Sequence, residues 1–343
     1  MQTYKIAFAG LRHGHILCMY DHIKEHNRID IVAACEEDKT TRDELIASRG
    51  MEITHSSFDR LLKETDCDII AVGDYYSNRG SLILKALQAG KHVIADKPIC
   101  TDKAELAAIR EYCDSRNLIL GCMLDLRDMP QFITARKLIR QGVIGEVQAI
   151  QIGGQHPLSP GSRPHWYFEA GKHGGTINDL AIHAVDLIPW ITGLTFDSLL
   201  SARCWNAFVP QYPHFKDAAQ FMAVMNNRAG LYCDVSYMVP DSLGYTHPLY
   251  WRITAWGRLG VIETSCTTSS VRLATARDTF FQEISLAEAN ENGYLKSFLN
   301  ELDKTTQPDD LTTRQVLRAG ATALDIQQAA EQEQFNLPLG SAF

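Results

Sequence analysis

Residues 83–99 read ILKALQAGKHVIADKPI. The first part has apolar residues at helical spacing and ends at Gly90, a residue type that commonly terminates a helix. The apolar triplet VIA then indicates a short buried strand, and Asp96, Lys97 and Pro98 come directly after it. A helix that leads into an apolar strand, with polar residues at the strand's end, is typical of a parallel sheet in an α/β domain.

The same alternation extends through the first 122 residues. Apolar strands are expected at YKIAFAG (4–10), IDIVAAC (29–35), CDIIAVG (67–73) and LILGCML (118–124), with helical segments between them. Strands that are apolar on both faces belong to a parallel sheet covered by helices on both sides, and right-handed crossovers make that sheet doubly wound. We therefore predict an α/β fold that begins with a Rossmann domain over residues 1–122.

The second half has a different pattern. Runs of alternating polar and apolar residues turn back at NNRAG (226–230) and GRLG (257–260), which are typical hairpin signals. They predict a large open antiparallel sheet within a C-terminal α+β domain over residues 123–343. Helices are expected near residues 130–141, 174–193, 291–304 and 313–332.

The composition, with 45% hydrophobic and 22% charged residues, is that of a soluble globular protein. A net charge of −8 argues against a nucleic-acid-binding protein, which needs a basic surface to replace phosphate counterions. No apolar run approaches the ~20 residues that cross a membrane, and we expect no signal peptide. The nine cysteines are scattered and form no C-x-x-C pair, which favours reduced core cysteines in a cytoplasmic protein.

The turn FAGLRHGHI (8–16) joins the first strand to the first helix. The dinucleotide fingerprint G-x-G-x-x-G has Gly10 at its first position, but Arg12 and His15 replace the other two glycines. The strand, tight turn and helix start still form an anion site, because backbone N–H groups and the helix dipole attract negative charge. Arg12 and His13 either lie against a pyrophosphate or are exposed turn residues.

Glu36 follows the second strand. An acid at this place accepts both ribose hydroxyls of NAD and repels the 2′-phosphate of NADP, so the sequence favours NAD. The alternative is a solvated acidic turn. Gly73 and Asp96 also lie just past strand ends. Because ligands of such folds bind at the carboxyl ends of the strands, these residues should converge with Gly10 on one crevice.

Lys97 should reach into the same crevice. A lysine there can donate to a substrate hydroxyl and favour its alkoxide form, and partial desolvation lowers its pKa so that it can take part in proton transfer. Pro98 fixes the turn and makes the Lys97–Pro98 bond a candidate for the cis form. The alternative is a surface lysine paired with Asp96.

The segment NDLAIHAVDLIPW (178–190) places Asp179, His183 and Asp186 at i, i+4 and i+7, on one helical face. A histidine with acids one turn on either side is held in one tautomer and kept basic, as a general base needs. The alternatives are a core histidine with surface acids, and a metal site formed by Asp179 and His183. Because the H-E-x-x-H spacing is absent and the sequence fixes no further ligand, we expect no metal.

These segments, in this order, resemble the glucose–fructose oxidoreductase, inositol dehydrogenase and MocA (Gfo/Idh/MocA) family over nearly the whole chain. That family has a glycine-rich turn, an E-K-P motif and a helical D-x-x-x-H motif. In this chain GLRHGH (10–15), DKP (96–98) and DLAIH (179–183) are similar to them.

The resemblance implies an NAD-dependent dehydrogenase that acts on a sugar, inositol or related polyhydroxy substrate. His183 would take the hydroxyl proton as hydride leaves for the nicotinamide. Lys97 would polarise that oxygen, and Asp179 would orient the base or hold a neighbouring hydroxyl. The resemblance also implies a homodimer or homotetramer formed through the open sheets of the C-terminal domains.

The chain departs from the family pattern at GDYYSNRG (73–80), where we expect Asp74 and Tyr75 to contact the cofactor. Arg127, in a segment similar to the family's entry into the second domain, is expected to bind substrate. So are His165 and Trp166, because aromatic rings stack on sugar faces and histidines bond hydroxyls. Their segment, HPLSPGSRPHWYF (156–168), also offers His156, Arg163 and Tyr167. The alternative is an ordered structural loop.

Two other functions are open on the sequence. One is an NAD-dependent glycosidase that oxidises its substrate transiently, as some relatives of this fold do. The other is a non-catalytic NAD-sensing regulator. The presence of both Lys97 and His183 favours an enzyme, because a protein that only binds a ligand does not need a base.

Overall fold

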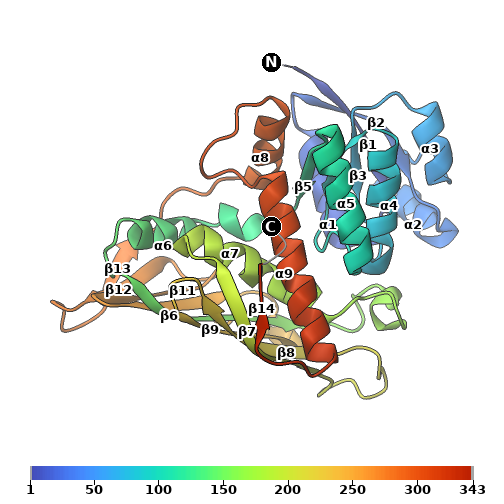
Figure 1. Cartoon of the computed structure of the whole chain (residues 1–343). Coiled ribbons are helices and arrows are strands. Elements are labelled where there is room, and N and C mark those ends of the chain that lie inside the picture. The colour runs from blue at the N-terminus through green and yellow to red at the C-terminus, as the bar shows by residue number, and fades with distance from the viewer. Residues whose placement is uncertain (1, 341–343) are drawn as a thin grey trace.

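The computed structural model describes residues 2–340, which form two sheets surrounded by helices (Figure 1). The first half forms a five-stranded parallel sheet of order β2-β1-β3-β4-β5. Its strands are β1 (Tyr4–Ala9), β2 (Ile29–Cys35), β3 (Ile69–Val72), β4 (His92–Ala95) and β5 (Leu120–Cys122). The helices between them are α1 (Gly14–Lys24), α2 (Lys39–Arg49), α3 (Phe58–Glu64), α4 (Tyr76–Gln88) and α5 (Lys103–Arg116). The doubly wound parallel sheet predicted from the sequence is confirmed.

The stretch 83–99 has the structure expected of it. α4 ends at Gln88, and Gly90 has a φ of 75°, the left-handed conformation that glycine adopts easily where a chain leaves a helix. The strand β4 follows, with its last three residues buried. The Lys97–Pro98 bond is cis, as the sequence suggested.

Both faces of the parallel sheet are covered, but one covering helix comes from the far end of the chain. Helices α3, α4 and α5 contribute to the core on one face. On the other face α1 and α2 share a core with α8 (Gly293–Leu302). The residues of α8 in that core are Tyr294, Leu295, Phe298 and Leu299. A segment nearly 300 residues from the N-terminus thus completes the first half of the molecule.

The second half forms a nine-stranded sheet of order β13-β12-β11-β10-β6-β9-β8-β7-β14. Its strands are β6 (Val147–Pro157), β7 (Phe196–Trp205), β8 (Ala218–Met225), β9 (Gly230–Val239), β10 (Arg252–Gly257), β11 (Gly260–Thr264), β12 (Ser270–Thr275), β13 (Gln282–Ser285) and β14 (Leu337–Pro338). Both predicted hairpins are present, as β8–β9 and β10–β11. The pairing is antiparallel except between β6 and β9, which run parallel because the long connection through α7, β7 and β8 separates them.

Helices cover one face of this sheet, and they are α6 (Pro130–Arg140), α7 (Ile182–Thr192) and α9 (Thr313–Glu331). Figure 1 shows them all on the same side of the sheet, whereas the opposite side carries no helix of residues 2–340. Exposed apolar side chains lie on strands of this sheet, among them Leu200, Met222 and Trp256.

The cysteines are all unpaired, and six of the nine are buried. Cys204 and Cys266 are half-buried and Cys18 is exposed. Within residues 2–340, the helices are too short or too polar to span a bilayer.

Candidate active site

A cavity of about 250 Å³, here called the site cavity, lies between the two halves of the molecule. The first half contributes His13, His15 and Lys97 to its wall, and the second contributes Asp179 and His183. The other lining residues are Asp125, Leu126, Met129, His156, Arg163, Tyr167, Leu180, Tyr245, Tyr250 and Trp251. The lysine and the histidine that the sequence singles out therefore border one space.

Lys97 forms a buried ion pair with Asp179. Its Nζ lies 2.8 Å from Asp179 Oδ1 and 2.9 Å from the backbone oxygen of the same residue. Burial by itself would raise the pKa of Asp179, but the ammonium of Lys97 and the nearby His173 hold that pKa well below its usual range. The carboxylate is therefore ionised. It accepts one N–H of Lys97 and the backbone oxygen of Asp179 accepts a second, so one of the three N–H groups is left.

Asp179 lies in a π-helical turn, Ile177–Ala181, directly before α7. A π-turn holds more residues per turn than an α-helix, so it changes the facing of the residues that follow. Asp186, seven residues on, does not face the site cavity. Its carboxylate accepts two hydrogen bonds from Arg127, at 2.8 and 2.5 Å. The structure thus brings Asp179 and His183 together and turns Asp186 towards a different partner.

His183 is a buried imidazole with a free nitrogen. Among residues 2–340, its Nδ1 has no hydrogen-bond partner, and its ring packs edge-on against Trp251 with centroids 5.1 Å apart. Burial lowers the pKa of His183 well below its usual value, and the charge of Lys97 lowers it further. The ring is therefore neutral. The expectation that acids on either side keep it basic is wrong, because Asp186 pairs with Arg127 and Asp179 raises the pKa less than burial lowers it.

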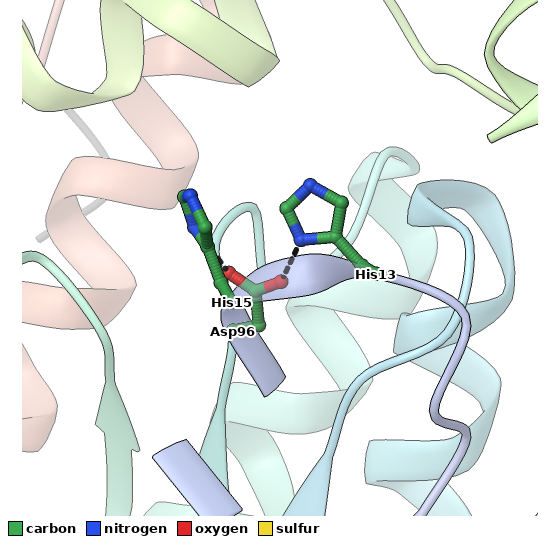
Figure 2. A group of neighbouring side chains, drawn as sticks. All are labelled: His13, His15 and Asp96. Atoms are coloured by element: carbon green, nitrogen blue, oxygen red, sulfur yellow. Dashed lines mark hydrogen bonds and ion pairs between the residues drawn. The ribbon is translucent and has the colours of Figure 1, made fainter. Parts of the chain in front are cut away.

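Asp96 does not pair with Lys97, so that alternative is excluded. Figure 2 shows the side chains of His13 and His15 directed at the Asp96 carboxylate. His13 Nδ1 lies 2.5 Å from Oδ2, and His15 Nδ1 lies 3.3 Å from Oδ1. Arg79 Nη2 lies 2.6 Å from Oδ2 and completes a buried ion pair. Burial lowers the pKa of His13 to about 3, against the opposing effect of Asp96.

Among the described residues, His13, His15 and Asp96 lie close enough together to hold a metal ion. One ligand atom from each of His13, His15 and Asp96 lies within 4.8 Å of the others. However, the guanidinium of Arg79 already neutralises the one carboxylate, and a further cation would be repelled by it. We therefore assign these residues to a hydrogen-bonded cluster and not to a metal centre.

The turn before α1 fits the pyrophosphate of a dinucleotide. α1 begins at Gly14 without a side-chain cap, so its first N–H groups are available to an anion. A Cβ at Gly14 would meet nothing within 4 Å, which leaves open space beside the helix start. Gly10 has another role: with a φ of 72° it packs against Asp74, and a Cβ there would lie 2.6 Å from the Asp74 Cβ.

Glu36 is fully buried, which excludes a solvated acidic turn. It accepts hydrogen bonds from the N–H groups of Leu11 at 2.6 Å and Asp38 at 2.8 Å. Arg12 Nε lies 3.1 Å from Glu36 and 3.2 Å from Asp74. Arg12 therefore covers Glu36 at the end of β2, and a ribose bound there must lie beside Arg12 or displace it.

The remaining residues expected to bind cofactor lie around the same turn. The carbonyl of Gly73 accepts a hydrogen bond from Arg79 Nε at 3.0 Å. Asp74 accepts from the N–H of Tyr75 at 2.7 Å, and the ring of Tyr75 lies under the guanidinium of Arg12 at 5.2 Å.

The three residues expected only to bind substrate lie outside the lining of the site cavity. Arg127 is held by Asp186, as described above. His165 is on the surface, with 87% of its side chain exposed. Trp166 is buried, and its Nε1 donates to the backbone oxygen of Arg12 at 3.0 Å. Their neighbours Arg163 and Tyr167 line the site cavity instead.

Sequence reasoning missed the residues that surround Asp179. Tyr76 donates to Asp179 Oδ1 at 2.7 Å, Tyr237 donates to Oδ2, and His173 Nε2 lies 3.3 Å from Oδ2. Tyr76 is the first residue of α4 and closely follows the end of β3, where the sequence already points to Gly73 and Asp74. Its place near the site could therefore have been predicted. Tyr237 belongs to β9 and His173 to a loop, and no local pattern marks either one.

Comparisons with known proteins identify the family of both halves of the chain. Residues 4–123 match the model described as oxidoreductase family, NAD-binding Rossmann fold, and residues 132–263 match the GFO/IDH/MocA C-terminal domain. A trans-1,2-dihydrobenzene-1,2-diol dehydrogenase of Oryctolagus cuniculus is 25% identical over 163 residues, 48% of this chain and 49% of that protein. An inositol 2-dehydrogenase of Rhizobium meliloti is 25% identical over 48% of this chain and 47% of that protein. The chain spans about half the length of the curated relatives it matches.

Solved structures share the fold over nearly the full length. A putative oxidoreductase from Thermotoga maritima is 24% identical, with a TM-score of 0.83 over 97% of this chain and 99% of that chain. A levoglucosan dehydrogenase in complex with NADH and levoglucosan is 17% identical, with a TM-score of 0.79 over 98% and 100%. With both of its halves matched by models of one family, the chain belongs to the Gfo/Idh/MocA oxidoreductases and carries their NAD-binding Rossmann domain.

Proposed function

We propose that the protein is an NAD-dependent dehydrogenase that oxidises a CH–OH group of a sugar, inositol or related polyhydroxy compound. The observation that carries the proposal is the common cavity of Lys97 and His183, one from each half of the chain. Relatives named for dihydrodiol and inositol oxidation support the reaction class, and one neighbour was solved with levoglucosan.

The cofactor would be held by the Rossmann domain, with its pyrophosphate at the uncapped start of α1 beside Gly14. Glu36 and Asp74 favour NAD over NADP, because buried carboxylates at the end of the strands repel a 2′-phosphate. When bound, NAD supplies the acceptor for the hydride.

The side chains of the site cavity would handle the proton. The neutral imidazole of His183, which lines the site cavity, accepts it from the substrate hydroxyl. The third N–H of Lys97, which Asp179 does not occupy, donates to the same substrate oxygen and stabilises negative charge on it. Asp179 acts as a positioning residue, since it fixes the ammonium and does not bond the histidine.

The lining of the site cavity suits a compact polyhydroxy substrate. Trp251 and Tyr250 provide aromatic surfaces, which pack on the C–H faces of sugars. Arg163 and His156 add groups that bond hydroxyls or carboxylates, and the volume of about 250 Å³ limits the substrate to a small molecule.

Screening sugars, inositols and sugar acids for NADH formation tests the proposal. We expect turnover with at least one of them, and a loss of about 10²–10⁴-fold in kcat for Lys97→Ala and for His183→Ala, with NAD affinity nearly unchanged. His214→Ala, at an exposed histidine, is the matched control and should keep full activity.

Three results would contradict the proposal. Full activity in both variants would remove the assigned roles. Release of free sugar from a glycoside without net NADH would identify the glycosidase. NAD binding with no turnover on any compound, together with NAD-dependent binding to another macromolecule, would identify the regulator.

The proposal includes a cytoplasmic homodimer or homotetramer. Reduced cysteines support the compartment. The helix-free face of the nine-stranded sheet, with Met222 and Trp256 exposed on its strands, supports the interface. Light scattering should give a multiple of the chain mass, and Met222→Glu with Trp256→Glu should reduce it to the monomer.

A further inference from the structure

A second cavity, of about 350 Å³, shares no lining residue with the site cavity. Four arginines from three segments meet in its wall, and we call it the arginine cavity. Arg127 comes from the turn before α6, Arg136 and Arg140 come from α6, and Arg318 comes from α9. In a chain with a net charge of −8, such a concentration of positive charge needs an explanation.

Carboxylates neutralise only two of these arginines. Arg127 donates hydrogen bonds to the carboxylate of Asp186, and Arg136 Nη1 lies 3.0 Å from Asp309 Oδ2. Within residues 2–340, neither Arg140 nor Arg318 forms an ion pair with a carboxylate. Among the residues that the structure describes, two positive charges are therefore left over at one cavity.

Arg140 is held in place although it has no counter-charge. Its Nη2 donates to the backbone oxygens of Pro189 at 3.4 Å and Trp190 at 3.1 Å, and its other nitrogens stay available. Gly193 makes room for it, because a Cβ there would lie 1.9 Å from Arg140 Nη1. Arg140 is exposed overall, but partial burial lowers its pKa, and the like charge of Arg136 lowers it further.

A separate observation also points to a missing ligand. Trp190 lines the arginine cavity, and its buried Nε1–H has no acceptor among residues 2–340. A buried donor without a partner destabilises a protein, so such groups usually face a ligand, an ion or water. The guanidinium of Arg136 lies over the Trp190 ring at 4.8 Å, so the residue with the unpaired donor packs against one of the four arginines.

We propose that the arginine cavity binds a small oxyanion with at least two negative charges, carried by phosphate or carboxylate groups. Arg140 and Arg318 supply the two uncompensated charges, and their planar donor groups match the oxygens of both anion types. Trp190, whose indole N–H has no acceptor among residues 2–340, borders the same cavity. The inference stands apart from the dehydrogenase proposal, because none of these residues lines the site cavity.

Calorimetry with inorganic phosphate, pyrophosphate and citrate, each at ionic strength matched with NaCl, tests the inference. We expect one of the three to bind with 1:1 stoichiometry and to raise the melting temperature more than NaCl does. Arg140→Gln with Arg318→Gln should weaken that binding at least tenfold. Preference for pyrophosphate over citrate would identify a phosphate ligand, and the reverse would identify a polycarboxylate.

Two variants make the experiment specific. Arg314→Gln removes an exposed arginine of α9 outside the arginine cavity and should leave anion binding unchanged. Arg140→Lys with Arg318→Lys keeps the charge and should retain part of the affinity, which guards against a folding defect in the glutamine variant. The inference is overturned if none of the three anions binds, or if binding is the same in the wild type and the glutamine variant, since the anion would then sit elsewhere.

Discussion

The ion pair of Lys97 and Asp179 is the residue-level feature on which the active site is built. Lys97→Met would leave the Asp179 carboxylate buried, with Tyr76, Tyr237 and His173 as its remaining partners. We expect a loss of about 3 kcal/mol in the free energy of unfolding. The double variant Lys97→Met with Asp179→Leu removes both charges and should recover part of that loss. Urea unfolding measures both; a double variant less stable than the single one would contradict the pairing.

The buried imidazole of His13 makes the stability of the fold depend on pH. Its pKa is about 3 in the folded protein, against an ordinary value of 6.5. Between these values the unfolded chain takes up a proton that the folded protein does not, so stability falls as the pH falls through this window. His13 alone should contribute about 1.4 kcal/mol per pH unit.

Unfolding measured at several pH values between 7 and 5 checks this prediction. His13→Asn should reduce the pH slope of the free energy of unfolding by the equivalent of about one bound proton. His214→Asn, at an exposed position, should leave that slope unchanged. Equal slopes for all three proteins would show that His13 is not the group responsible.

At the scale of elements, the loop of residues 158–175 is docked on the nucleotide-binding half. Trp166 is its main anchor, through the hydrogen bond to Arg12 and an edge contact with Tyr76 at 4.9 Å between centroids. Trp166→Ala should cost about 3 kcal/mol and release the loop locally. Hydrogen exchange across residues 158–175 should rise in this variant and stay unchanged in His165→Ala, where the side chain is exposed. Unchanged exchange in the tryptophan variant would mean that other contacts hold the loop.

The elements of the first half could be predicted because their signals are local. The apolar runs of β1, β2 and β3 and the glycine after α4 act over a few residues, and the order of motifs placed Lys97 near His183. The facing of Asp186 could not be predicted, because the π-turn at Ile177–Ala181 changes the helical period that the spacing argument assumes. Tyr237 and His173 reach Asp179 only through long-range folding, so no pattern in their own segments reveals them.

At the scale of the whole molecule, α8 ties the end of the chain to its beginning. Phe298 is 1% exposed and lies against β5, where a Cβ at Gly121 would be 2.7 Å from its ring. Phe298→Ala should cost about 3–5 kcal/mol and lower the melting temperature of the nucleotide-binding half. Lys296→Ala, on the exposed side of the same helix, is the control. Calorimetry should show the shift; an unchanged melting temperature would contradict the packing.

The sequence predicted α8 as a helix but not its location. An amphipathic helix fits any apolar surface of suitable shape, and its own residues do not say which sheet it will cover. The predicted domain boundary at residue 122 therefore divides the chain in sequence, but α8, which follows that boundary, packs with the first half.

The position of α8 also limits how the two halves of the molecule can move apart. A hinge between the halves would have to pull this helix from the sheet it covers or from the chain that leads into α9. Large swings of one half against the other are therefore disfavoured. The segment held by Trp166 borders the site cavity through Arg163 and Tyr167, so a shift of this segment would reshape the cavity while both sheets stay in place.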